Sequence, residues 1–142
     1  MLNMDPITLR TALAQLEQAT HDYVEWHSNL LREIVCGLPL DLSDLAEGAH
    51  FHCLFGRWYY ERAPAELWGQ PAFAAIGTEH ERLHRIAARL LREVAADGPI
   101  VRGDFEELLA GCTRLRLELD SLRREIVGRE EGLQRQLRQG DV

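Results

Sequence analysis

Residues 72–96 read AFAAIGTEHERLHRIAARLLREVAA, and this stretch decides the fold class. Its larger apolar residues recur mostly at steps of three, four or seven, which places them on one face of an α-helix. These residues are Ile76, Leu83, Ile86, Leu90, Leu91 and Val94. The same helix carries His80 and His84, four residues apart, so both imidazoles leave one face, one turn apart. The stretch therefore predicts a long amphipathic helix that also presents a pair of metal ligands.

Helical periodicity extends over nearly the whole chain, and glycines and prolines divide it into four segments. Asp5 and Pro6 are typical of a helix start, so the first segment covers residues 6–36. The second covers residues 42–60 but contains two glycines, and we expect a short helix, a turn and another helix there. The third is the 72–96 stretch, and the fourth begins near Asp104. Four helical segments joined by short connections predict an all-α fold, an antiparallel four-helix bundle.

The fourth segment has the heptad spacing of a helix that packs along one seam. Its apolar positions are Phe105, Leu108, Cys112, Leu115, Leu119, Leu122 and Ile126. A heptad pattern that reaches the end of a chain suits a dimer contact or a linker to another domain. We expect residues 1–128 to form the bundle, residues 129–142 to be an extended C-terminal helix or a frayed linker, and the protein to be a homodimer.

Composition limits the classes of function. The chain has 142 residues, 46% of them hydrophobic, which suits one domain with one core. Its net charge is −7, from 23 acidic and 16 basic residues, and this disfavours a nucleic-acid partner. No stretch approaches the roughly 18 apolar residues that span a bilayer, and the N-terminus does not resemble a signal peptide. Three cysteines without C-x-x-C spacing suit a reducing compartment. We expect a cytoplasmic chain without membrane contact.

The histidine pair also fits the H-E-x-x-H motif of zinc peptidases, in which Glu81 would be the general base. Such an enzyme needs a third ligand downstream and a strand that holds the substrate. Only glutamates of solvent-facing character follow the pair, and no strand pattern is visible. Glu81 fits equally well as a surface residue paired with Arg85 on the next turn. A zinc metallopeptidase stays open as an alternative.

A hemerythrin-like di-iron protein is a second alternative, since it also uses a helical bundle and a histidine pair. The chain has six histidines, enough for two irons: His21, His27, His50, His52, His80 and His84. A di-iron site also needs bridging carboxylates and an H-x-x-x-E pair. That pair is missing, because Leu54 follows His50 and Gly56 follows His52 at the fourth position.

The run Cys53-Leu54-Phe55-Gly56-Arg57-Trp58 favours a third interpretation. It closely resembles the C-x-F-G-[RK]-W signature of the chemoreceptor zinc-binding (CZB) domain family. The family has a histidine shortly before a tryptophan in its first helix, matched by His21 and Trp26, and the H-x-x-x-H pair follows the cysteine motif. Order and spacing agree over about residues 14–91. The resemblance implies zinc as cofactor, held by His21, Cys53, His80 and His84.

One thiolate and three imidazoles fill a tetrahedral zinc shell, which leaves no position for a catalytic water. The resemblance therefore implies a regulatory domain and not an enzyme. Trp26 and Trp58 would cover the site, while His27, His50 and His52 lie outside the ligand pattern. Family members sit on chemoreceptors and diguanylate cyclases, and this chain looks most like the N-terminal zinc-sensing domain of the cyclases. The implied partner is a cyclase or receptor signalling domain, in cis or in trans, and the implied input is zinc or hypochlorous acid.

Overall fold

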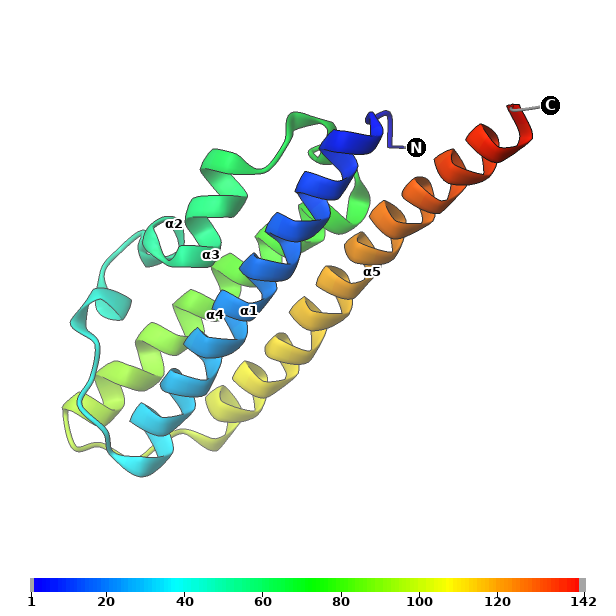
Figure 1. The fold of residues 1–142 in the computed structure, drawn as a ribbon. Helices are drawn as coiled ribbons and strands as arrows, with labels where there is room; N and C mark the ends of the chain where they lie inside the picture. The colour runs from blue at the N-terminus through cyan, green and yellow to red at the C-terminus, as the bar shows by residue number, and fades with distance from the viewer. Residues whose placement is uncertain (1, 141–142) are drawn as a thin grey trace.

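Three long helices run side by side and form most of the molecule (Figure 1). The structure, a computed structural model, describes residues 2–140. The long helices are α1 (Pro6–Cys36), α4 (Pro71–Ala95) and α5 (Arg102–Gly140). Between α1 and α4 lie only short pieces, which are η1 (Leu42–Leu45), α2 (Ala49–His52), α3 (Leu54–Arg57), the π-helix η2 (Trp58–Arg62) and η3 (Ala65–Leu67).

The short pieces take the fourth position of the bundle, and the chain reverses its direction from one position to the next (Figure 1). The predicted all-α four-helix bundle is thereby confirmed, with one of its four helices broken. We call residues 42–62 the broken segment. The expectation of a short helix, a turn and another helix was too simple, because the segment contains four short pieces.

The ends of α1 follow from local chemistry. The Asp5 carboxylate accepts a hydrogen bond from the Thr8 backbone N–H at 2.8 Å, and Pro6 occupies the first turn. Gly37 ends the helix in the left-handed conformation, with φ of 69°. Both predicted boundaries of this helix are confirmed.

Apolar side chains of the three long helices meet in a single core. The predicted heptad seam of α5 supplies its inner face, and Gly111 lets α5 approach α4, because a Cβ there would lie 2.8 Å from the Leu83 side chain. Residues of the core that are almost fully buried include Leu9, Leu16, Leu30, Ile76, Leu83, Leu90, Leu108, Leu115 and Leu122. The long helices thus provide a rigid frame against which the broken segment packs.

A few specific contacts hold the broken segment to this frame. The Tyr59 hydroxyl donates to the Phe73 carbonyl of α4 at 2.6 Å. The Trp58 indole N–H donates to the Gln15 side chain of α1 at 3.2 Å. Gly77 of α4 accommodates the Tyr59 ring, since a Cβ at that position would overlap the phenol. These contacts anchor the end of the broken segment to α1 and α4.

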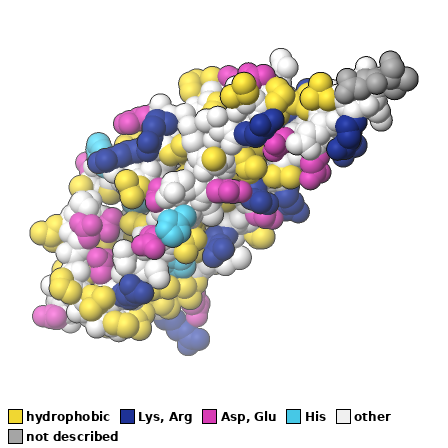
Figure 2. Space-filling model, viewed as in Figure 1, with side chains coloured by type: hydrophobic (Ala, Val, Ile, Leu, Met, Phe, Trp, Pro, Cys, Tyr) yellow, Lys and Arg dark blue, Asp and Glu magenta, His cyan; other side chains and the backbone are white. Residues whose placement is uncertain are grey.

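Helix α5 continues without a break beyond residue 128 and extends past the other helices (Figure 1). The domain boundary at residue 128 and the homodimer stay predictions. None of the helices within residues 2–140 combines the length and apolar content needed to cross a bilayer. On the face seen in Figure 2, arginine and acidic side chains are interspersed among hydrophobic ones.

Candidate metal centre

His80 and His84 lie on the inner face of α4, one turn apart. Their side chains are buried, with 1% and 4% of the residue surface exposed, although histidine is usually found near water. Their ring centroids lie 4.7 Å apart and the ring planes are nearly perpendicular. Burial of two adjacent imidazoles in an otherwise apolar helix face is costly unless their nitrogens have partners.

Cys53 lies at the junction between α2 and α3. Its backbone is extended, with φ of −67° and ψ of 159°, so the chain turns there and the thiol caps α3 by accepting the Gly56 N–H at 3.2 Å. Gly56 is required at this turn, because a Cβ would overlap the backbone carbonyl oxygen of His50. The break in the helix therefore serves to aim the sulfur inward.

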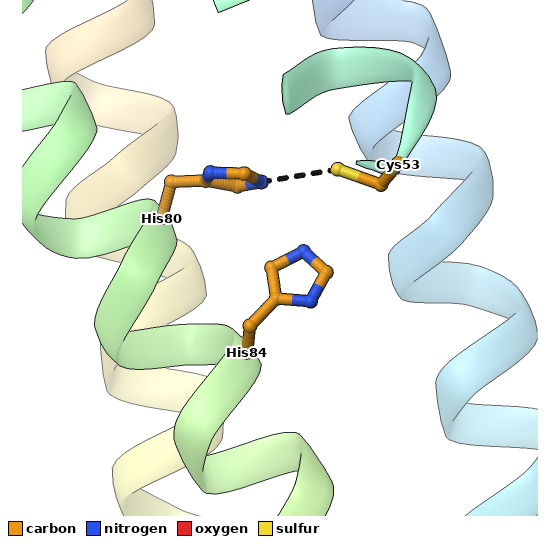
Figure 3. Close-up of side chains that lie close together, drawn as sticks. All are labelled: Cys53, His80 and His84. Atoms are coloured by element: carbon orange, nitrogen blue, oxygen red, sulfur yellow. Dashed lines mark hydrogen bonds between the residues drawn. The ribbon is translucent and has the colours of Figure 1, made fainter. Parts of the chain in front are cut away.

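The three side chains converge on one point. The Cys53 Sγ lies 3.3 Å from His80 Nε2, and His84 projects toward the same space from the next turn of α4 (Figure 3). One ligand atom from each residue lies within 4.8 Å of the others. Zinc binds sulfur at about 2.3 Å and imidazole nitrogen at about 2.0–2.1 Å, so the ligand atoms of a tetrahedral site lie roughly 3.3–3.6 Å from each other. The group is close to the size of a zinc site.

Among residues 2–140, three of the four ring nitrogens of His80 and His84 lack a hydrogen-bond partner, which is the observation that tests their fit to a metal. Both ring nitrogens of His84 and Nδ1 of His80 are buried without a hydrogen-bond partner. Buried polar atoms in native proteins are nearly always paired, so each of these exceptions needs an explanation. A metal ion takes one nitrogen from each ring, so an ion bound by His80, His84 and Cys53 would give His84 a partner that the protein does not provide, and the residues fit the group.

The protonation states also suit metal binding. Burial, and secondarily the nearby His84 and His50, lowers the pKa of His80 to about 2. Burial, and then His50, lowers the pKa of His84 to about 4. Both imidazoles are therefore neutral at physiological pH, as ligation requires. Burial raises the pKa of the Cys53 thiol, against the opposing effect of the Gly56 N–H, so this group must lose a proton when it binds a metal.

Helix α1 contributes an aromatic cover. The Trp26 indole stacks on His84 with centroids 4.5 Å apart, and its N–H donates to the Asp44 carboxylate at 3.0 Å. Asp44, Trp26 and the three converging residues line one cavity of about 500 Å³. Burial raises the pKa of Asp44, and the Trp26 hydrogen bond opposes that effect. Trp58, the other expected cover, instead packs against Phe55 and Phe73 in the core.

The structure does not bring His21, the fourth expected ligand, to this group. Its side chain is 65% exposed and lies 3.7 Å from the carboxylate of Glu25, itself exposed. The residue of α1 that contacts the site is Trp26. His21 and Glu25 share a solvent-facing side of α1, whereas Trp26 faces α4.

His50, which the sequence places outside the ligand pattern, lies beside the histidine pair. Its ring centroid lies 6.3 Å from that of His80 and 6.3 Å from that of His84. The only sequence signal was its position three residues before Cys53, and the broken helix made the direction of that side chain unpredictable. Of the other two histidines, His52 is exposed, and His27 stacks on Tyr23 with centroids 6.1 Å apart.

Residues 24–91 match the family model of the chemoreceptor zinc-binding domain. This part of the chain is a CZB domain. The match contains Cys53, His80 and His84, and it begins three residues after His21. No curated protein and no solved structure matches the chain. The CZB family binds zinc, and the cluster of one cysteine and two histidines can hold a metal ion.

Proposed function

We propose that this chain is a regulatory zinc-binding sensor in which Cys53, His80 and His84 hold one zinc ion. The observation that carries the proposal is the convergence of a thiol and two buried, unpartnered imidazoles inside the residues that match a zinc-binding family. Zinc would bind the Cys53 thiolate and the two neutral imidazoles, and the residues around them would exclude water.

The site connects separate parts of the bundle, which is what a sensor requires. Cys53 belongs to the broken segment, the histidines belong to α4, and Trp26 of α1 covers His84. Because ligands from different elements share one ion, zinc occupancy is coupled to how these elements pack. The output would be a change in packing of the broken segment, read by a cyclase or receptor signalling domain, in cis or in trans. A cytoplasmic homodimer is part of this proposal.

The geometry favours a regulatory site over the two alternatives. The third metal-binding group is a cysteine that precedes the histidine pair, whereas a peptidase of the H-E-x-x-H type takes its third ligand downstream. Glu81, the general base of such an enzyme, forms an ion pair with Arg85. A thiol at the centre of the site also differs from the bridging carboxylates of a di-iron protein.

Oxidation is a second input that the same group would accept. Hypochlorous acid would transfer oxygen to the Cys53 thiolate, giving a sulfenic acid and releasing chloride. The sulfenic acid is a poorer zinc ligand than the thiolate, so oxidation would release the metal. Zinc release measured with a coloured chelator during titration with hypochlorous acid tests this input, and retention of zinc by the oxidised protein would contradict it.

Metal analysis of the purified chain tests the proposal. We expect one zinc per chain and, after replacement by cobalt(II), the sulfur-to-cobalt charge-transfer band of a thiolate ligand. Cys53→Ala should lose the band and most of the zinc. Cys36→Ala, which changes an exposed cysteine, is the matched control and should keep both. Equal zinc content and an unchanged spectrum in Cys53→Ala would overturn the proposal, and two irons per chain would support the di-iron alternative.

A further inference from the structure

Three converging ligands leave one position of a tetrahedral zinc shell to be filled. Helix α1 lines the cavity, but its predicted ligand His21 is exposed and the residue over His84 is the indole of Trp26. Neither of these two residues supplies the missing group, which leaves the other elements near His80 and His84, or solvent.

We propose that His50 is the fourth ligand, so that the broken segment supplies two of the four groups that bind the metal. This inference rests on the proposed zinc site. The His50 ring lies at equal distance, 6.3 Å between centroids, from the rings of both His80 and His84. Its backbone carbonyl lies 3.7 Å from the Cys53 sulfur, which is the distance of a weak S–H hydrogen bond. His50 is therefore next to all three converging residues.

The surroundings of His50 permit the small movement that ligation would need. Its ring is partly exposed and packs against Phe51 at 4.1 Å and Tyr60 at 6.0 Å between centroids. Among residues 2–140, no hydrogen bond or ion pair holds the ring. Helix α2, which carries it, is a single turn that follows Gly48 in the left-handed conformation, with φ of 77°. A one-turn helix with few tertiary contacts adjusts at low cost.

Asp44 is the competing candidate, because its carboxylate lines the same cavity as Cys53. One of its oxygens already accepts the Trp26 indole N–H at 3.0 Å. That bond gives Asp44 a role of its own, which is to orient the indole that covers His84. The His50 ring has no such hydrogen bond among residues 2–140, and its centroid lies 6.3 Å from the ring centroids of both His80 and His84.

The assignment has a structural consequence. His50 and Cys53 lie on either side of the junction between α2 and α3, so one ion would tie both short helices to α4. Helix α1 would then line the cavity, with Trp26 over His84, without supplying a ligand. Zinc would order the broken segment without a bond to α1.

Single substitutions in the full chain test the assignment. His50→Ala is expected to weaken zinc binding more than about 100-fold, since loss of a ligand should exceed the 10–100-fold effect of losing a group behind a ligand. Its cobalt(II) spectrum should keep the sulfur charge-transfer band but lose the intensity of a four-coordinate site. His27→Ala changes a histidine of α1 that does not line this cavity; it is the matched control and should leave both unchanged. Far-UV circular dichroism verifies that each variant folds.

Two further variants identify the fourth group if it is not His50. Zinc affinity within about threefold of the parent in His50→Ala would overturn the inference, and a large loss in His21→Ala or Asp44→Asn instead would name the true ligand. His84→Ala distinguishes this failure from failure of the whole site. If His84→Ala abolishes binding while His50→Ala does not, the zinc site stands and only His50 is excluded. If neither variant binds zinc less well, the proposed site itself is wrong.

Discussion

The long helices and the broken segment differ in how each is held in place. Helices α1 and α4, and α5 from Leu108 to Ile126, bury an apolar side chain on nearly every turn, so their positions follow from one shared core. The broken segment, residues 42–62, buries only Ala49, Phe55, Gly56 and Trp58. A region with few buried contacts opens more easily than one in the core. The comparison indicates that the long helices maintain the fold, whereas the broken segment is the part that a bound metal can order.

The largest effect on stability is expected in the long helices. Leu115 of α5 is fully buried, so Leu115→Ala should lower the free energy of unfolding by about 2–5 kcal/mol. Leu117 on the same helix is 61% exposed, and Leu117→Ala should change it by less than about 0.5 kcal/mol. Urea unfolding measures both. Zinc per folded chain should be unchanged in both variants, and loss of zinc in Leu115→Ala would show that the core and the site are not separate.

The same substitution, glycine to alanine, can be compared at Gly56 in the broken segment and at Gly128 in α5. Gly56→Ala places a methyl group against the His50 carbonyl and 3.3 Å from the Cys53 sulfur, so the turn must open. We expect a loss of about 1–3 kcal/mol in stability and a large loss of zinc affinity. In Gly128→Ala the new methyl group meets nothing, and a helix interior should gain about 0.5–1 kcal/mol. Unaltered zinc binding by Gly56→Ala would mean that the turn does not aim Cys53.

Trp26 and Trp58 distinguish a tryptophan that covers the site from one that belongs to the hydrophobic core. Trp26→Phe keeps a ring over His84 but loses the hydrogen bond to Asp44, and zinc affinity should fall roughly 10-fold. Trp58→Phe removes a buried indole that bonds to Gln15, so it should cost stability and leave the affinity unchanged. Isothermal titration calorimetry with a competing chelator measures the zinc affinities of both variants. The opposite pattern, with Trp58 governing affinity, would contradict the placement of the cover on α1.

The long helices were predictable because their signals are local. The start of α1 at Pro6 and its end before Gly37 follow from capping chemistry that involves neighbouring residues alone. Helix α4 and the start of α5 were predicted to within about two residues from apolar spacing. The broken segment was not, because the π-helix η2 depends on contacts distant in sequence, such as that of Tyr59 with Phe73.

The candidate site shows the same difference between features set by local sequence and features set by distant contacts. His80 and His84 share a regular helix, so spacing alone predicted that they lie together, and the cysteine motif added Cys53. His21 was predicted as a ligand from the family resemblance, and spacing could not show that its side of α1 faces solvent. It also could not predict the direction of His50, since that depends on the turn at Gly48 and Cys53.

Hydrogen exchange with and without zinc tests most directly whether the metal orders the broken segment. At a zinc concentration about 100-fold above Kd, amides that open only when the metal leaves should exchange about 100-fold more slowly. We predict this protection in residues 42–62, with α5 amides that open independently of the site unchanged. Equal protection along all helices, or none in residues 42–62, would contradict the account.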